Sequence, residues 1–147
     1  MKLRALFATA LLVTAGCEYM PFAGGPLDGT PAPSPADWRT LGDVDIVQLE
    51  TLREGEPYSV NIWMIAEETH LYVYGGENYA QWAENMDAAD AARMKIEGAV
   101  YELRGARVSD EEEFARFARA WLAKYGSDRT DSTAADTYLY RLVARDG

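Results

Sequence analysis

Six short segments of this chain are apolar or alternate apolar and polar residues, and turns containing glycine, proline or acidic residues separate most of them. The segments are 43–52, 58–66, 71–76, 92–97, 99–108 and 137–145. Alternation with a period of two puts every second side chain on one face of a strand, so each segment predicts a β-strand. Six mostly antiparallel strands predict a mainly β, α+β fold built as a small barrel or strongly curled sheet.

The first two segments carry more detailed expectations. Val44 and Ile46 are followed by Val47 and Leu49, and this slip of one residue predicts a bulge in the first strand. The second segment, YSVNIWMIA, is apolar at most positions. A strand of this kind is predicted to be central, with both of its faces covered.

Two other segments have the spacing of helices. Residues 81–92 are rich in alanine and place Trp82 and Met86 at helical spacing, which predicts a first helix. Ser109 lies three residues before Glu112, as in a capping box, and Gly126 is suited to end the helix that follows. The apolar stripe of this second helix consists of Phe114, Phe117, Trp121 and Tyr125.

The N-terminus has the pattern of an export signal. Lys2 and Arg4 precede a mostly apolar run over 5–13, and the sequence TAGC ends at Cys17. The run is shorter than the roughly 20 residues that span a bilayer, so cleavage is favoured over a retained membrane helix. The TAGC motif resembles the lipobox of bacterial lipoproteins, although Thr14 replaces the usual Leu, Val or Ile. Residues 1–17 are therefore predicted to be a lipoprotein signal peptide with Cys17 as the lipidated residue, and the alternative is an ordinary secretory signal.

The composition of the remaining chain differs between a segment rich in proline and glycine and the part that follows it. Residues 18–36 hold most of the six prolines and no hydrophobic period, which predicts a flexible tether before a barrel domain at 37–147. Cleavage would leave 12 basic against 24 acidic residues, a net charge of about −12. This acidity disfavours nucleic acid as a partner, because nucleic acid requires clustered basic charge.

The counts of cysteine and histidine exclude several kinds of site. Cys17 is the only cysteine, so no internal disulfide can form. His70 is the only histidine and is expected to be a solvated turn residue beside Glu67 and Glu68. No metal site is predicted, and serine hydrolase chemistry is disfavoured. The acidic run at 110–113 is better explained as the start of a helix.

The order of these elements resembles the split β-barrel of flavin-binding proteins, and most closely the deazaflavin-dependent nitroreductase family. The resemblance covers residues 44–143 and rests on Gly55 and Pro57 before the second strand, Trp63 within it, LYVYGG, and the block ARMKIEGAVYELRGARVSDEEE. It implies FMN or a deazaflavin as cofactor, bound between the barrel and a neighbouring helix or subunit. It also implies a homodimer as a hypothesis.

The resemblance implies candidate cofactor-binding residues. Gly75 and Gly76, with Tyr79 nearby, would approach the phosphate, and the N-terminus of the first helix would supply N–H groups. Against this, Tyr58 stands where relatives often have a basic residue, Glu77 would repel an anion, and a glycine pair is commonly only a turn.

An aromatic cluster could enclose a flat ring or could belong to the core and rim of the barrel; it consists of Tyr58, Trp63, Tyr72, Tyr74, Tyr79 and Trp82. All of these except Tyr72 are candidate cofactor-binding residues. No catalytic residue is assigned. Two functions therefore stay open. One is a membrane-anchored oxidoreductase of the cell envelope that uses a flavin or deazaflavin. The other is a cofactor-free barrel that contacts an envelope partner or a small apolar ligand.

Overall fold

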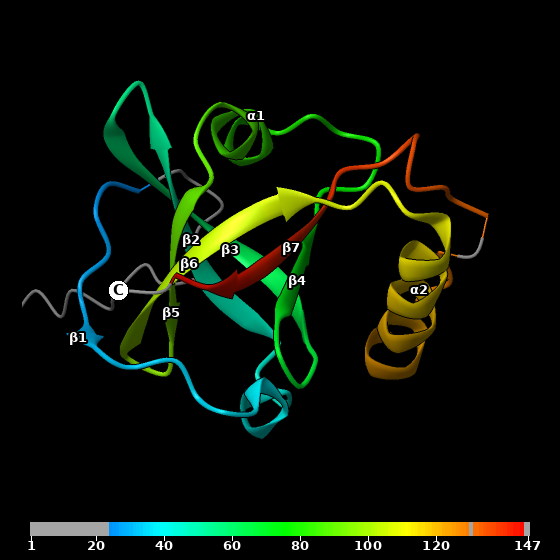
Figure 1. Ribbon diagram of the computed structural model, residues 1–147, viewed down its shortest axis with the longest axis horizontal. Helices are drawn as coiled ribbons and strands as arrows, with labels where there is room; N and C mark the ends of the chain where they lie inside the picture. The colour runs from blue at the N-terminus through cyan, green and yellow to red at the C-terminus, as the bar shows by residue number, and fades with distance from the viewer. Residues whose placement is uncertain (1–23, 130, 146–147) are drawn as a thin grey trace, which may run out of the picture.

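The computed structural model describes residues 24–129 and 131–145, which form a closed antiparallel barrel (Figure 1). The strands follow the order β6-β5-β2-β3-β4-β7, and pairing of β6 with β7 closes the barrel. The barrel strands are β2 (Ile46–Arg53), β3 (Glu56–Ala66), β4 (Leu71–Tyr74), β5 (Ala91–Ile96), β6 (Ala99–Arg107) and β7 (Leu139–Ala144). The prediction of a six-stranded, mainly β barrel with two α-helices is confirmed.

Every second side chain along each barrel strand points inward, and these side chains fill the interior of the barrel. Leu49, Met64, Leu71, Met94 and Leu103 are fully buried and belong to one hydrophobic cluster. Two helices cover the ends of this core: α1 (Gln81–Ala88) lies at one end and the short 3-10 helix η1 (Trp38–Leu41) at the other (Figure 1). Burial of these apolar side chains is the main stabilising contribution to the fold.

The helix α2 (Glu111–Tyr125) lies outside the barrel. A second hydrophobic cluster joins its Phe117 and Trp121 to Ile65, Tyr72 and Leu139 on the outward faces of β3, β4 and β7. Both faces of β3 are therefore covered at Ile65, as predicted. The prediction is wrong at Trp63, whose exposed fraction is 46%, because α2 leaves this part of the outer face open.

Three predicted element boundaries are wrong. The first strand begins at Ile46 and has no bulge, since β2 pairs with β3 residue by residue and Val44 belongs to the preceding turn. The first helix ends at Ala88, because the following residues pair with β6 and tertiary pairing overrides alanine's helix propensity. The second helix is capped by Asp110, whose carboxylate accepts from the Glu113 N–H at 2.7 Å, and Ser109 is outside the cap.

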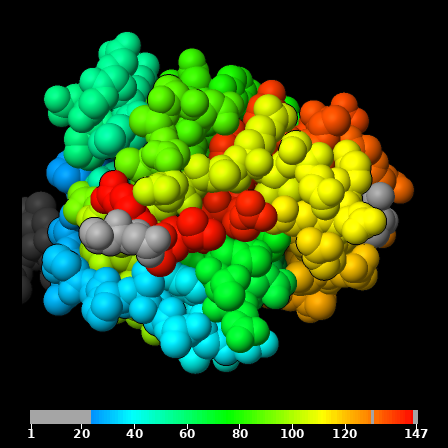
Figure 2. All heavy atoms as spheres, viewed as in Figure 1, coloured from blue at the N-terminus to red at the C-terminus, as the bar shows by residue number. Residues whose placement is uncertain are grey.

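The segment before η1 lies against the barrel. The two-residue strand β1 (Thr30–Pro31) pairs with β6 in parallel, and the Leu27 N–H donates to Glu50 Oε2 at 2.7 Å. Figure 2 shows the blue atoms of this segment on one flank of the barrel. Residues 24–32 of the predicted tether are therefore bonded to the barrel, through Gly24, Leu27, Thr30 and Ala32, and the division of the chain into a tether and a domain stays a prediction.

The remaining predictions for the N-terminus, including the tether at 18–23 and lipidation of Cys17, lie outside the described residues. In the part of the chain that is described, no helix has the length and apolar character needed to cross a bilayer.

A polar cluster fixes the first turn of α2 to β4 and β7. The buried Glu113 carboxylate accepts from the Tyr72 hydroxyl at 2.8 Å and from Arg141 Nη1 at 2.9 Å. Burial, followed by the hydrogen bond to Glu113, raises the pKa of Tyr72 well above its usual range.

His70 packs edge-on against Tyr72 at this cluster, with 4.7 Å between the ring centroids. Its Nε2 is buried and has no hydrogen-bond partner among the described residues. Burial also lowers the pKa of His70. His70 is therefore half-buried and not fully solvated as expected: packing on Tyr72 shields its Nε2 side, whereas its Nδ1 lies 3.0 Å from the Thr69 hydroxyl at an exposed position.

Candidate functional site

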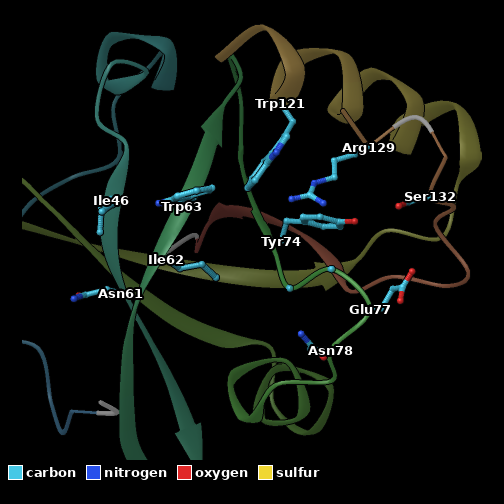
Figure 3. A pocket seen from close by; sticks show the side chains of 12 residues that line it. Ile46, Asn61, Ile62, Trp63, Tyr74, Glu77, Asn78, Trp121, Arg129 and Ser132 are labelled. Carbon is cyan, nitrogen blue, oxygen red and sulfur yellow. The ribbon is translucent and has the colours of Figure 1, made fainter. Parts of the chain in front are cut away.

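A cavity of about 720 Å³ lies on the outer side of the barrel, beside α2 (Figure 3). Its walls come from β2, β3, the end of β4, the loop between β4 and α1, α2, and the loop after α2. The predicted residues Trp63, Tyr74, Gly75 and Gly76 all line it. The fold thus brings four of the seven predicted cofactor residues to one cavity, although this does not test whether they bind a cofactor.

Aromatic side chains make one wall of the cavity. The Trp63 ring is stacked on Tyr125, with centroids 5.1 Å apart and planes at 17°, and Trp121 meets both Trp63 and Tyr74 at 5.8 and 5.5 Å. Trp63 points away from the barrel interior because its neighbour Met64 points inward, as the alternation of a strand requires. An exposed indole held by a stacked partner offers a flat apolar surface to a ligand.

The last turn of α2 holds this aromatic wall in place. The Tyr125 hydroxyl donates to the Met64 carbonyl at 2.7 Å, and Lys124 Nζ donates to the Val44 carbonyl at 2.7 Å. Burial raises the pKa of Tyr125 to about 12 and lowers the pKa of Lys124. The first bond joins α2 to the backbone of β3 next to Trp63, and the second joins it to the residue Val44 before β2, so the position of Trp63 depends on α2.

Arg129 enters the cavity from the loop over 126–138. Figure 3 shows its side chain next to Trp121 and Tyr74, and its guanidinium carbon lies 5.9 Å from the Tyr74 ring centroid and 6.0 Å from that of Trp121. No carboxylate of residues 24–129 or 131–145 forms an ion pair with it. Cation–π contact with two rings is therefore its main described interaction.

Two hydrogen-bond donors at the cavity are unsatisfied. Arg129 Nε and Trp121 Nε1 are buried and have no partner within the described residues. Buried polar groups in proteins are nearly always bonded, so unsatisfied groups in a cavity wall indicate a missing acceptor. Water or the carbonyl or anionic edge of a ligand would supply it, once the Arg129 side chain shifts.

The glycine pair that the sequence singled out makes a bonded turn. The Gly75 N–H donates to the Tyr138 carbonyl at 2.9 Å, the Tyr138 N–H donates to the Gly76 carbonyl at 2.8 Å, and Gly76 has a φ of 63°. The Gly75 N–H is thus not free to bind a phosphate in this geometry. Glu77 also lines the cavity here. Phosphate binding by this loop remains a prediction.

Three predicted residues do not line the cavity. Tyr58 packs against the barrel core, and Trp82 is buried and meets Tyr140 edge-on at 5.4 Å. Tyr79 is 48% exposed and stacks on Tyr138 at 4.6 Å. Because they lie outside this cavity, it gives no support to their predicted contact with a cofactor, which stays a prediction.

Several cavity residues were not predicted from sequence. Trp121 was assigned to the helix stripe, and Arg129, Asn61 and Ser132 were not singled out. The place of Trp121 in the aromatic stripe, one turn before the end of the helix, was a usable signal for this residue. For Arg129 no local signal exists, because it is one polar residue in a polar loop.

The cavity fits the ring of a flavin better than its phosphate. Aromatic walls and unsatisfied N–H donors suit a flat ring with carbonyl groups. A phosphate requires several charge-assisted donors, and Arg129 is the one cationic side chain among the described lining residues. Within the described chain, no group of three or more His, Cys, Asp or Glu residues is arranged to hold a metal ion.

No protein-family model matches this chain, and no curated protein matches it in sequence. Three similar solved structures are a candidate pyridoxamine 5′-phosphate oxidase from Listeria innocua, an FAD-binding protein from Mesorhizobium loti and an F420 reductase. Their TM-scores are 0.59, 0.56 and 0.53, at identities of 13%, 18% and 17%. The matches cover 72%, 74% and 77% of this chain, and 88%, 86% and 97% of the respective structures.

The likeness establishes the fold: the chain has the split β-barrel fold of these proteins, and the resemblance in fold predicted from its sequence is confirmed. Function does not follow from a fold shared at such low identity.

Proposed function

We propose that this protein is an oxidoreductase that binds a flavin-type cofactor, FMN or a deazaflavin, with its ring in the cavity beside α2. The observation that carries the proposal is the pair of unsatisfied donors, Arg129 Nε and Trp121 Nε1, in an aromatic cavity of about 720 Å³. The names of the similar structures, which include an FAD-binding protein and an F420 reductase, support the same class of cofactor.

Each wall residue has a distinct role in this proposal. Trp63 and Tyr74 supply flat apolar surface for the ring and exclude water from it. Arg129 and Trp121 donate hydrogen bonds to its carbonyl edge. A bound flavin or deazaflavin would itself supply hydride transfer, and the protein would orient it and tune its charge.

Titration of the purified full-length chain with riboflavin, FMN and a deazaflavin, followed by fluorescence, tests the proposal. We expect binding by the wild type and an affinity for riboflavin at least about tenfold lower in Arg129→Gln, which loses a charged donor. Arg53→Gln is the matched control, because Arg53 is exposed in a strand-end position away from the cavity. Absence of binding to all three compounds refutes the proposal.

One observation favours a second candidate function, a cofactor-free barrel that binds a small apolar ligand or an envelope partner. The described lining of the cavity carries one cation, Arg129, and one carboxylate, Glu77, so it has little net charge for a phosphate-bearing cofactor. If the flavins fail to bind while an uncharged aromatic probe such as 1-anilinonaphthalene quenches Trp63 fluorescence, this second function is favoured.

We further propose that the protein is anchored in the bacterial cell envelope through lipidated Cys17. Cleavage and two or more acyl chains would hold it on a membrane. Mass spectrometry of the mature N-terminus should find a lipidated cysteine, and Cys17→Ser should release the protein from the membrane fraction.

A homodimer is proposed as well. Trp63 and Ile46 are 46% and 42% exposed beside the cavity, and a second subunit could cover them. Light scattering that finds a monomer at every workable concentration would exclude the dimer.

A further inference from the structure

A smaller cavity of about 170 Å³ continues the proposed ring site along the outer face of the barrel. It shares Ile46 and Asn61 with the larger cavity, and Lys95 and Glu97 line its other end. The two cavities therefore form one groove that starts at the aromatic wall and ends at a lysine.

The strand register gives the length of this groove. Gln48 of β2 is paired with Asn61 of β3 on one side and with Lys95 of β5 on the other, so these three residues form a row across the outer face. Trp63 lies two residues beyond Asn61 on the same strand, opposite Ile46. Strand spacings of about 4.8 Å and a rise of about 3.3 Å per residue separate the backbones of Trp63 and Lys95 by roughly 12 Å.

The N-terminal segment supplies a carboxylate at the lysine end. Lys95 Nζ donates to Asp28 Oδ1 at 2.8 Å, and the Lys95 side chain is 18% exposed whereas that of Asp28 is 96% exposed. The lysine is thus held in the groove, and its partner is in solvent. An ion pair with one solvated partner contributes little to stability, so another anion can replace Asp28 at small cost.

We propose that Lys95 is an anion subsite for the ligand of the ring cavity, and that Asp28 occupies this subsite until an anionic ligand displaces it. The ligand class is a flat ring carrying a short chain that ends in a phosphate or carboxylate. This inference rests on the proposed function and adds to it a second contact outside the ring cavity. It also makes the N-terminal segment a competitor of the ligand, because the segment is fixed beside Lys95 by the bond between Thr30 and the Gly98 carbonyl.

Glu97 is the other charged residue that lines this end of the groove, and its carboxylate opposes an anion. Among the described residues, Asp28 forms an ion pair with Lys95 and Glu97 does not. Glu56→Gln, at an exposed position that lines neither cavity, is the matched control for Asp28→Asn: each change removes one negative charge, and only the second releases Lys95.

The test compares FMN with riboflavin, which has the same ring and no phosphate, on the full-length wild type and the variants Lys95→Gln, Asp28→Asn and Glu56→Gln. We expect the wild type to prefer FMN, and Lys95→Gln to lose this preference with a roughly tenfold weaker binding of FMN alone. Asp28→Asn should strengthen FMN binding by about 2- to 5-fold. Glu56→Gln should change it by less than about twofold, and riboflavin binding should stay constant throughout.

Two failures can be told apart. If riboflavin binds but the ratio of the FMN and riboflavin affinities is the same in Lys95→Gln as in the wild type, the anion subsite is refuted and the ring site stands. If neither compound binds, the proposed function and this inference both fall. An equal gain in Asp28→Asn and Glu56→Gln would refute the competition by Asp28. Urea unfolding midpoints equal to that of the wild type would establish that each variant is folded.

Discussion

Replacing Glu113 by alanine should lower the free energy of unfolding by about 2–4 kcal/mol. The change removes the acceptor of the buried Tyr72 hydroxyl, and a hydrogen bond to an ionised group contributes about 1.5–3 kcal/mol. It also removes the pair with Arg141, whose side chain is 42% exposed, so this part adds at most about 1 kcal/mol. The exposed Glu112 on the same turn is the matched control, and Glu112→Ala should cost less than about 0.5 kcal/mol.

Equilibrium unfolding in urea, followed by the fluorescence of the four tryptophans, measures this loss. The single variants Glu113→Ala and Tyr72→Phe, together with the double variant, form a double-mutant cycle. We expect a coupling free energy of about 1–2 kcal/mol, because Tyr72→Phe removes the hydroxyl that Glu113→Ala leaves unsatisfied. The double variant should therefore be more stable than the sum of the single losses implies.

Additive losses, within about 0.5 kcal/mol, would refute the reasoning, because they would mean that the Tyr72 hydroxyl does not depend on Glu113. If Glu112→Ala lowered the free energy of unfolding as much as Glu113→Ala, the stabilisation would come from acidic side chains at the helix N-terminus in general and not from the bond to Tyr72. Since α2 also carries Trp121, a destabilised helix start should weaken riboflavin binding in Glu113→Ala more than in Glu112→Ala.

Three further changes are predicted. Gly105→Ala should cost about 1–3 kcal/mol in urea unfolding, since the added Cβ would overlap Met86 Sδ and lie 3.1 Å from Leu142 Cδ2. Gly126→Ala should cost about 1–2 kcal/mol because the residue ends α2 at a φ of 68°; an unchanged melting temperature would contradict this. His70→Gln should reduce the loss of stability at acid pH. Burial lowers the pKa of His70 in the folded protein, so the unfolded chain takes up the proton first as pH falls. The wild type should therefore lose stability as the pH drops from about 6.5 through the lowered pKa, and the variant should lose less. Melting temperatures of both proteins between pH 7 and 4 decide the last point.

The sequence by itself determined the elements whose patterns are local. Alternation at Ala92, Met94 and Ile96 predicted β5, and the aromatic stripe with Gly126 predicted α2 and its end. These signals are readable because period and turn chemistry act between near neighbours. The same signals misplaced the end of α1, where pairing of β5 with β6 outweighed the helix propensity of alanine.

Only the tertiary structure decided the site. Closure of the barrel and docking of α2 bring Trp63 to the same cavity as Trp121 and Arg129, although Trp63 is far from the other two in the chain and each has an ordinary local context. The cation at the cavity, Arg129, comes from the loop after α2, and the segment expected to be a tether places Asp28 on Lys95. Contacts of this kind depend on which surfaces meet when the chain packs, and local propensity does not predict them.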